Sequence, residues 1–537
     1  MEHPFLYQYI LWALAFLSMA PALVLELRRD LMMLQQNSYR SERYMGWLRQ
    51  SGDTTAVSRL LAYIILLLSL VNLPLENVAL ICMIVYGICR TCQLAVKKYK
   101  KPLVMTPRAR RLFFTQLILS AVIILAAAGY FSFVGRDVMC YAAVVAVMSL
   151  YCLSHAITLA ALWLLKPVEK RINAKFYNAA AERLASMPDL RVVGITGSYG
   201  KTSTKHYLHR ILSEHFDTLM TPGSYNTTLG VVRTINELLK PYNEVFIVEM
   251  GAKQTGDIKE ICDLVHPRIG IITAVGPQHL QTFHTIENVR DTKFELADAL
   301  PADGLAVVNN DFEQSAGRAV SNTRCMRYGV SNPVGCNFTA ADIRYSANGT
   351  DFTVKGPDGF SLKLHTNLVG ECNISNLIAA VIVALELGVP ADKIRYAVST
   401  IQQVEHRLQM RPAGNGVTII DDAFNSNPTG SRMALDVLAS MKDGNRIVIT
   451  PGMIELGDMQ FELNKEFGSH MAECCDYAII VNEYNAEAIL TGLKEAGFPE
   501  DRVFTAATFT EAYAQAMKFA TPGSAILIEN DLPDTFK

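Results

Sequence analysis

The run of residues 194–205, GITGSYGKTSTK, combines the residue types that bind nucleotide phosphates. An apolar stretch leads into glycines at 194, 197 and 200, and a helix is expected to begin near Lys201. Glycines let the backbone turn tightly and point its N–H groups inward, while the helix start adds a positive dipole end. Lys201 can then reach a β- or γ-phosphate, and the Thr202 hydroxyl can hold Mg²⁺. We expect ATP to bind at Gly197, Ser198, Tyr199, Gly200, Lys201, Thr202 and Ser203. The alternative interpretation is a structural turn before a helix.

Six further polar motifs follow in order along the chain. They are TPGSYNTTLG at 221–230, VEMG at 248–251, GPQH at 276–279, DTK at 291–293, EHR at 405–407 and DDAFNSNP at 421–428. With the glycine-rich run they resemble the Mur ligase family over about residues 187–530. The resemblance is closest to the members that add D-alanyl-D-alanine to a UDP-linked muramoyl tripeptide in peptidoglycan synthesis. It implies an ATP-dependent ligase that requires Mg²⁺, with two ions expected.

Two residues are candidate metal ligands because each follows an apolar strand. Glu249 ends one such stretch, where a carboxylate can bind Mg²⁺ directly or through water. His279 closes the next one, and the alternative for it is a loop histidine with ordinary hydrogen bonds. Both resemble metal positions of the family, but His279 is the weaker ligand because Mg²⁺ prefers oxygen.

Lys293 and Asn226 complete the expected catalytic set with Lys201 and His279. In the family the lysine that matches Lys293 is carbamylated by CO₂ and then serves as a metal ligand. Carbamylation needs an uncharged amine, so we expect burial or a nearby cation to lower the pKa of Lys293. The alternative is a solvated helix lysine. Asn226 resembles an asparagine near the phosphates and acyl substrate, but Ser224 and Thr227 stand where asparagines are common in the D-alanyl-D-alanine branch.

The resemblance also assigns residues around the rest of the nucleotide. Asn373 and Asn376 match positions near adenine, although helix capping is the alternative for Asn373. Arg407 matches a phosphate-facing arginine, suited to bidentate contact, and Asp422 matches a ribose-facing aspartate. A last pair, Asn425 and Asn427, is expected either to shape the loop near the incoming amine or to form a turn.

The first 166 residues contain long apolar runs, at 5–25, 60–73, 78–94, 113–134 and 138–165. Some approach the roughly twenty residues that cross a bilayer, and we expect five crossings. The second run is short, and alternatively it pairs with the third as a re-entrant hairpin around residues 72–74.

Basic residues set the expected orientation of these crossings. Arginines and lysines cluster at 28–59, 97–111 and 166–175, whereas residues 1–4, 72–77 and 135–137 carry one among them. Cytoplasmic loops carry the excess of basic residues, so we expect the N-terminus outside and residues after Lys166 in the cytoplasm. The chain is thus expected in the inner (cytoplasmic) membrane. The formal net charge of −2 argues against a nucleic-acid partner.

Eleven cysteines are scattered without a disulfide or ligand framework. Cys89 and Cys92 form a C-x-x-C pair at the end of an apolar run, and Cys474 and Cys475 are adjacent. We interpret both pairs as inert small hydrophobic residues.

Beyond the membrane region the sequence alternates short apolar runs with helical stretches, which is typical of α/β domains with mostly parallel sheets. We expect strands at 191–196, 245–250, 269–275, 305–309, 417–421, 446–450, 477–481 and 525–529. We expect a transmembrane region at 1–166, a cytoplasmic connecting segment at 167–186, a central ATP-binding domain at 187–402 and a Rossmann-like C-terminal domain at 403–537. Residues 337–365 are expected to form an antiparallel excursion from the central sheet.

These features favour a membrane-anchored ligase that joins a carboxylate to the amine of an amino acid or dipeptide through an acyl phosphate. Membrane segments stand where the family has a UDP-gripping domain, and residues 526–533 lack the Lys-Gly-Ser typical there. The expected acceptor is therefore a cell-envelope precursor or related peptide polymer, and the D-alanyl-D-alanine-adding step is the alternative. A non-catalytic membrane scaffold or an ATP-dependent transporter is the alternative of another class. The apolar runs hold few polar residues, chiefly Gln8, Gln116 and His155, which disfavours a transporter. A scaffold is disfavoured because the set of site residues is present together: Lys201, Thr202, Glu249, His279, Lys293 and Arg407.

Overall fold

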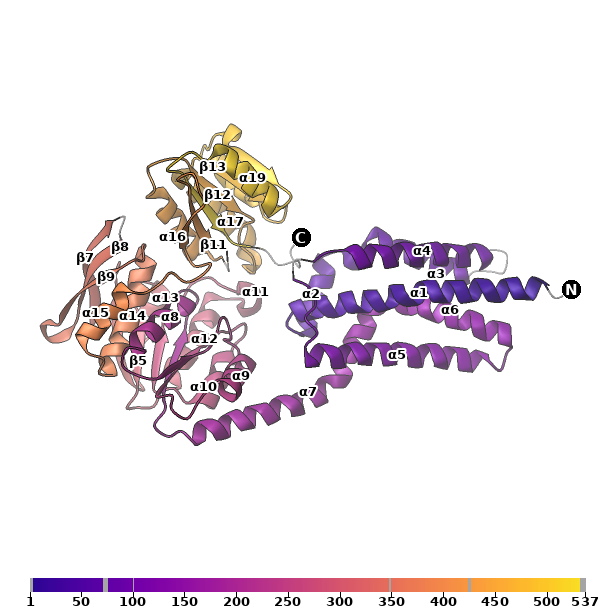
Figure 1. Ribbon diagram of the computed structural model, residues 1–537, viewed down its shortest axis with the longest axis horizontal. Coiled ribbons are helices and arrows are strands. Elements are labelled where there is room, and N and C mark those ends of the chain that lie inside the picture. The colour runs from indigo at the N-terminus through magenta and orange to yellow at the C-terminus, as the bar shows by residue number, and fades with distance from the viewer. Residues whose placement is uncertain (1–2, 71–75, 100, 347–348, 424–425, 532–537) are drawn as a thin grey trace. The chain divides into compact units, whose positions relative to one another are not determined.

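The structure is a computed structural model that describes residues 3–70, 76–99, 101–346, 349–423 and 426–531. The chain divides into a helical unit that extends to Ile172 and an α/β unit, Asn173–Asp531 (Figure 1). The division falls inside a continuous helix, so the expected connecting segment 167–186 is helical almost throughout. The expected boundaries at 166, 186 and 402 stay predictions.

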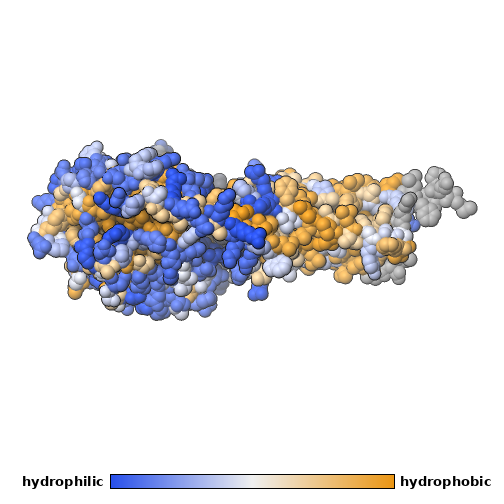
Figure 2. Space-filling model, turned by 90° about the horizontal axis from the view of Figure 1, so that it is seen from below, coloured by the Kyte–Doolittle hydropathy of each residue, from blue (hydrophilic) through white to orange (hydrophobic). Residues whose placement is uncertain are grey.

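The described residues of the helical unit form seven α-helices. They are α1 (His3–Gln36), α2 (Ser41–Gln50), α3 (Val57–Leu70), α4 (Glu76–Val96), α5 (Pro107–Phe131), α6 (Arg136–Cys152) and α7 (Ser154–Ala185), with the short 3₁₀ turn η1 (Asp53–Thr55). Helix α1 packs against α4, α5 and α6, and its apolar residues form much of the core. The face of this unit seen in Figure 2 is mostly hydrophobic, whereas the α/β unit shows a mainly hydrophilic surface.

Three helical segments are long and apolar enough to cross a membrane: Tyr7–Gln36, Asn77–Val96 and Pro107–Ser132. Helices α6 and α7 are bent by 79° at their junction and together make at most a fourth span. Helix α3 has 14 residues and rises only about 21 Å, short of the roughly 30 Å hydrocarbon core. By length and composition the expected number of five crossings is therefore too high. The alternative hairpin around residues 72–74 lies outside the described residues.

Charged side chains are buried in the helical unit beyond those expected from the apolar runs. Arg59 is 1% exposed and donates to the Tyr151 carbonyl at 2.7 Å and to Glu26 Oε1 at 2.9 Å. Glu26 also pairs with Arg90 at 2.9 Å. His155 is a hydrogen-bonded residue, as expected, with Tyr44 Oη 2.9 Å from its Nδ1. The buried carboxylate of Glu26 is thus neutralised by arginines from α3 and α4.

The α/β unit begins with a nine-stranded sheet in the order β2-β3-β1-β4-β5-β6-β7-β8-β9. Its strands are β1 (Arg191–Thr196), β2 (Thr218–Met220), β3 (Val245–Glu249), β4 (Ile269–Ile272), β5 (Leu305–Asn309), β6 (Arg324–Gly329), β7 (Phe338–Ser346), β8 (Gly349–Lys355) and β9 (Ser361–Thr366). Pairing is parallel from β2 to β7 and antiparallel through β8 and β9, which confirms the expected excursion.

Apolar side chains on the two faces of this sheet form two cores. One contains residues of α8 (Lys201–Leu212), α14 (Glu371–Glu386) and α15 (Ala391–Ser399). The other contains residues of α9 (Thr228–Glu237), α10 (Asp257–Val265), α11 (Leu280–Phe283) and α12 (Ile286–Asp298). The short helix α13 (Glu313–Ala316) and the turn η2 (Pro357–Gly359) lie in connections. Because β1 lies between β3 and β4, the loops after these three strands meet at one edge, where α/β sheets bind ligands.

A six-stranded sheet follows, in the order β10-β11-β15-β12-β13-β14, parallel except for β10. Its elements are β10 (Gln409–Pro412), β11 (Thr418–Asp422), α16 (Pro428–Ala439), β12 (Arg446–Thr450), η3 (Gly457–Met459), α17 (Gln460–Cys474), β13 (Tyr477–Val481), α18 (Ala486–Glu495), η4 (Glu500–Arg502), β14 (Val503–Ala506), α19 (Phe509–Phe519) and β15 (Ala525–Glu529). Two successive α/β sheets after a helical region confirm the expected fold class.

Candidate active site

The glycine-rich run forms the turn between β1 and α8. Gly200 has φ +77°, a conformation that favours glycine, and a Cβ there would lie 2.3 Å from Asn376 Oδ1. The Lys201 ammonium folds back over the turn and donates to the Gly197 carbonyl at 2.6 Å and to the Ser198 carbonyl at 3.2 Å. Burial and the Arg407 guanidinium lower the pKa of Lys201 to about 8, against the opposing effect of Glu249. The Lys201 ammonium thus lies at the turn in which we expect the phosphates to bind.

Two side chains of the turn hold it against the loop after β4. The Ser198 hydroxyl donates to the Gly276 carbonyl at 2.9 Å, and the Tyr199 hydroxyl donates to the Pro277 carbonyl at 3.0 Å. Ser203, one turn into α8, is buried. Ser198 and Tyr199 therefore fix the shape of the turn through their side chains, which leaves phosphate contacts there to the backbone N–H groups.

The Glu249 carboxylate contacts two residues predicted from separate motifs and a third that was not predicted. Its Oε1 accepts from Thr202 Oγ1 and from Asn226 Nδ2, each at 3.1 Å. Its Oε2 lies 2.9 Å from Lys205 Nζ, and both side chains are at most 1% exposed. Burial raises the pKa of Glu249, but the ammonium groups of Lys205 and Lys201 outweigh burial and hold it below its usual value. The carboxylate is therefore ionised at neutral pH.

Lys205 is a member of this site that the motif analysis did not identify. It follows Lys201 by one helical turn, so both lysines lie on the same side of α8. Its side chain also donates to the Gly223 carbonyl in the loop before Asn226. The sequence feature that could have identified Lys205 is its spacing of one helical turn from Lys201, together with a glutamate at the end of a strand. A buried lysine needs a carboxylate partner, and Glu249 is such a carboxylate.

His279 sits at the start of α11 with φ +53°. Its Nδ1 is paired with the carboxylate of Glu455, which follows β12 in the second sheet. Burial lowers the pKa of His279, and Lys253 and Lys293 add to the lowering against the pull of Glu455. A neutral imidazole whose Nδ1 is held by a carboxylate has Nε2 available as a metal ligand. Glu455 was not predicted from the sequence.

Lys293 lies on α12 and is 1% exposed. Burial and the Lys201 ammonium lower its pKa to about 7, against the opposing effects of Asp257 and Glu295. The ammonium lies 5.9 Å from the centre of the Phe283 ring. The expected environment is confirmed, and the alternative of a solvated lysine is wrong. Carbamylation of Lys293 stays a prediction.

The two asparagines expected near adenine join α14 to α8. Asn373 Oδ1 accepts from the Tyr207 hydroxyl at 2.7 Å, and its Nδ2 donates to the Val369 carbonyl at 2.8 Å. Asn376 Oδ1 accepts from the Thr204 hydroxyl at 3.1 Å. Asn373 is not a cap, because the N-cap residue of α14 is Gly370 without a side-chain bond. Both asparagines thus support the helix that carries Lys201, and their contact with adenine stays a prediction.

Arg407 and Asp422 belong to one electrostatic group at the start of the second sheet. Burial lowers the pKa of Arg407, and the carboxylates of Asp422, Glu249 and Glu529 oppose this lowering. Asp422 Oδ1 accepts from the Leu408 N–H at 3.1 Å, and burial raises the pKa of Asp422 to about 6 against the effect of Arg407. The electrostatic influence of Glu249 on Arg407 links the predicted residues of the two sheets.

Glu529 is a further buried acid that the motif analysis did not identify. It pairs with Asp422 in the register of β11 and β15, and it accepts a hydrogen bond from the Ser426 hydroxyl. Burial and the Asp422 carboxylate raise the pKa of Glu529 well above its usual range. Nearby, Asn427 caps α16 by accepting from the Gly430 N–H at 2.7 Å, which confirms its turn role. Asn425 lies outside the described residues.

The oxygens around Thr202 and Glu249 suit Mg²⁺. Two oxygen donors from adjacent elements stand 3.1 Å apart beside the phosphate turn, and hard cations prefer oxygen. The Gly200 backbone comes too close to Asn376 to leave room for any side chain, as expected of a turn that a phosphate approaches. Thr202 and Glu249 would hold the metal, with His279 and a carbamylated Lys293 as the predicted further ligands. The residues present fit ATP and Mg²⁺.

Comparison with known proteins decides the family. The Mur ligase middle domain matches residues 195–384, and the Mur ligase glutamate ligase domain matches residues 406–529, together more than half of the chain. The chain belongs to the Mur ligase family. Both matches fall within the α/β unit, and they include every predicted site residue, from Gly197 to Asp422.

Named members of the Mur ligase family are similar over this region. The UDP-N-acetylmuramoyl-tripeptide–D-alanyl-D-alanine ligases of Escherichia coli and Bacillus subtilis are 32% and 28% identical, over 50% and 52% of this chain and 59% and 60% of their own lengths. The crystal structure of MurF from Acinetobacter baumannii aligns with a TM-score of 0.60 and 28% identity, covering 67% of this chain and 77% of that one. The chain thus spans about three fifths of the length of these two relatives.

Proposed function

We propose that this protein is a membrane-anchored, ATP-dependent ligase that joins a carboxylate to an amine through an acyl phosphate. The observation that carries the proposal is the meeting of Thr202, Asn226 and Lys205 on the carboxylate of Glu249, beside the Lys201 turn. Residues of two separate motifs, 194–205 and 221–230, thus meet on the ionised acid of a third, 248–251, at the ends of β1 and β3. Family membership supports the same chemistry.

The reaction that fits these residues has two steps. A carboxylate oxygen of the acceptor attacks the γ-phosphorus of ATP, the O–P bond forms, and the bond from that phosphorus to the β-phosphate oxygen breaks to release ADP. The amine nitrogen then attacks the acyl carbon, the carbon–oxygen bond to phosphate breaks, and the amine loses a proton as inorganic phosphate leaves. Mg²⁺, when bound, supplies charge neutralisation between the β- and γ-phosphates.

The side chains act by position and charge. The Lys201 ammonium exchanges its hydrogen bonds to the Gly197 and Ser198 carbonyls for contact with the γ-phosphate. Arg407 supplies a second cation, which is suited to bidentate phosphate contact. Asn226 donates to Glu249 through Nδ2, which fixes the orientation of its amide group, and Oδ1 is the atom that we expect to meet the acyl substrate. Glu455 orients the His279 ring. No nucleophilic side chain is required.

We propose a cell-envelope precursor or a related peptide polymer as the acceptor. The curated relatives act on a UDP-linked tripeptide and D-alanyl-D-alanine, as their names state, and this pair is the second candidate. The departure from that branch at Ser224 and Thr227 favours a different acceptor. Thr227 caps α9 by accepting from the Gly230 N–H at 3.3 Å. The residue type at position 227 therefore affects the conformation of the loop that positions Asn226.

The decisive assay measures ADP release by the full chain in detergent, with each substrate omitted in turn. UDP-N-acetylmuramoyl tripeptide and its lipid-linked counterpart are offered as acceptors, and D-alanyl-D-alanine or single amino acids as amines. We expect ADP formation that requires an acceptor and rises with an amine, and hydroxylamine should trap the acyl phosphate as a hydroxamate. Hydrolysis of ATP without any acceptor would instead favour the transporter, and no turnover with any pair would favour the scaffold.

We further propose that the helical unit anchors the ligase in the inner membrane with the α/β unit in the cytoplasm. The basic residues at 28–59 and 97–111 lie on one side if α3 and α4 enter the membrane and return to the same side without two full crossings, because α3 is too short for one. Accessibility labelling of single cysteines introduced at residues 135 and 186 tests this placement in intact cells. We expect labelling from outside at 135 only, and external labelling at 186 would refute the topology.

A further inference from the structure

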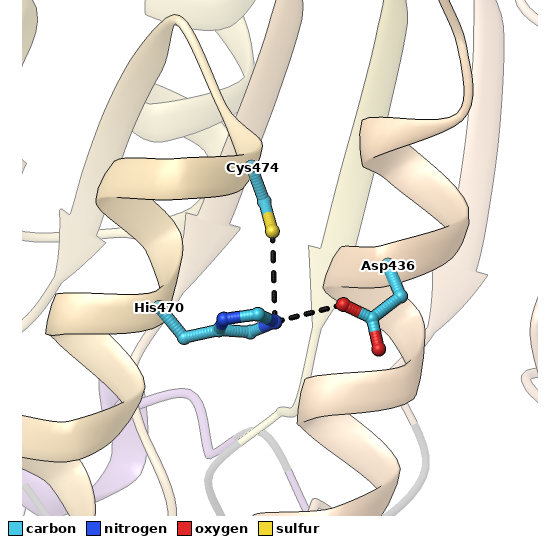
Figure 3. A group of neighbouring side chains, drawn as sticks. All are labelled: Asp436, His470 and Cys474. Atoms are coloured by element: carbon cyan, nitrogen blue, oxygen red, sulfur yellow. Dashed lines mark hydrogen bonds and ion pairs between the residues drawn. The ribbon is translucent and has the colours of Figure 1, made fainter.

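We infer that Asp436, His470 and Cys474 form a Zn²⁺ site that ties helix α16 to helix α17. Figure 3 shows the three side chains converging on one point, Asp436 from α16 and the other two from α17. His470 and Cys474 are four residues apart, which places them on one face of the helix. None of the three residues belongs to a motif that the proposed function uses.

The three donor atoms lie within 4.8 Å of one another, close to the separations that a tetrahedral zinc requires. Zn–S and Zn–N bonds of about 2.3 and 2.0 Å at a tetrahedral angle place sulfur and nitrogen about 3.6 Å apart, and nitrogen and a carboxylate oxygen about 3.3 Å apart. Cys474 Sγ lies 3.6 Å from His470 Nε2, and Asp436 Oδ1 lies 2.8 Å from the same nitrogen. Of these two distances, the first already fits and the second must open by about half an ångström for an ion to enter.

The histidine is oriented as zinc-bound histidines are. Its Nδ1 faces Glu473 Oε2 at 3.2 Å, so that the ring can donate its Nδ1 proton to a carboxylate while Nε2 faces the other two donors. Such a carboxylate fixes the tautomer and makes Nε2 a better ligand. Glu473 thus acts as a positioning residue, and it lies next to Cys474 in the sequence.

The donor set selects the ion. A thiolate, an imidazole and one carboxylate suit a borderline cation such as Zn²⁺, whereas Mg²⁺ and Ca²⁺ take oxygen ligands. The Asp436 side chain is 58% exposed, which leaves the fourth position to water. The other cluster of this kind among the described residues, Asp30, Asp53 and His155, is less suitable because Arg29 and Arg59 already pair with its carboxylates.

The position of the site gives the ion a structural effect. Helix α17 also holds the loop that carries Glu455, because Asn464 Oδ1 accepts from the Met453 N–H at 2.8 Å. Helix α16 begins at the cap residue Asn427. An ion bound between the two helices would therefore stiffen the segments that lead to the His279 contact, and we expect bound Zn²⁺ to raise the thermal midpoint of the C-terminal sheet.

Titration of the full chain with Co²⁺, a spectroscopic substitute for Zn²⁺, tests the assignment. We expect one thiolate-to-cobalt charge-transfer band that Zn²⁺ abolishes by displacement. The band should disappear in Cys474→Ser and remain in Cys475→Ser, a neighbouring buried thiol that is not in the cluster. Asp436→Asn alters an exposed side chain, so it should leave folding intact while weakening Co²⁺ binding at least tenfold.

Two results would overturn the inference: no band in the wild-type chain, or a band of equal strength in Cys474→Ser. Thermal scans with Zn²⁺ and with Mg²⁺ give a second readout, independent of ligase turnover. Zn²⁺ should raise the midpoint of the wild-type chain and of Cys475→Ser, and should leave that of Asp436→Asn nearly unchanged. An equal rise in all three would place the bound ion elsewhere.

Discussion

Replacing Lys205 by methionine should open the structure around Glu249 while preserving the volume of the side chain. The substitution removes one partner of an ion pair of 2.9 Å whose two side chains are at most 1% exposed. Breaking a buried pair in this way typically costs about 3 to 5 kcal/mol, because the remaining charge stays buried. Since about 1.4 kcal/mol corresponds to a tenfold change, the opened population should rise roughly 10²- to 10⁴-fold.

Hydrogen–deuterium exchange of peptides from α8 and β3 is the appropriate measurement. Intrinsic fluorescence would not serve, because Trp12, Trp47 and Trp163 are the only tryptophans of the chain and all precede the α/β unit. Exchange in these peptides should accelerate in Lys205→Met, and added Mg²⁺ should slow it, because the ion would supply the positive charge that Glu249 has lost. The effect of Mg²⁺ on the wild-type chain should be smaller.

Two further variants make the experiment decisive. Lys259→Met removes a surface pair with Asp263, in which both side chains are more than half exposed, and should barely change exchange. Adding Glu249→Gln to Lys205→Met removes the stranded charge and should recover most of the lost protection. The reasoning fails if Lys205→Met exchanges no faster than Lys259→Met, or if the double variant is no better protected than Lys205→Met alone.

Three further outcomes are expected. Lys201→Ala should lower the rate of ADP formation roughly 10²- to 10³-fold with folding unchanged, and near-normal turnover at saturating ATP would contradict its phosphate role. Carbamylation of Lys293 requires the neutral amine, so turnover at limiting bicarbonate should fall as the pH drops through about 7. Short carboxylic acids should partly restore the activity of Lys293→Ala. A flat pH response of the wild-type chain together with full activity of Lys293→Ala would exclude the modification. Gly200→Ala should weaken ATP binding at least tenfold in a fluorescent-nucleotide titration, because its Cβ would meet Asn376. Gly497→Ala has a similar φ and open space around it, so equal losses in the two would show that backbone strain alone is responsible.

The sequence was sufficient to predict the parts of the site that lie within single motifs. The Gly200 turn, the strand-ending Glu249 and the lowered pKa of Lys293 follow from local pattern and from the chemistry of the expected modification. Strands β1, β5, β12, β13 and β15 were predicted because they are short apolar runs that become fully or mostly buried. Strands β2 and β10 were missed, since these are short and carry only part-buried or exposed residues.

The remainder depends on partners that are distant in sequence. Lys205 looked like an ordinary helix lysine until β3 placed Glu249 beside it. Glu455 reaches His279 from 176 residues away, and no local spacing relates them. The role of Asn373 was ambiguous for the same reason, because its partner Tyr207 lies on another helix. The number of membrane crossings was overestimated because helix α3, which holds most of the second apolar run, is too short to span the hydrocarbon core.

The adjacent acids on β11 and β15 imply that nucleotide binding moves protons. Burial raises the pKa of Asp422 to about 6 and that of Glu529, in register beside it, well above its usual range, so the pair retains a proton near neutral pH, mainly on Glu529. A ribose that donates its hydroxyl hydrogens to Asp422 would favour the ionised carboxylate, so ATP binding should release protons near pH 6, where Asp422 is partly protonated. The heat of ATP binding should consequently vary with the ionisation enthalpy of the buffer, and affinity should fall as the solution is made more acidic.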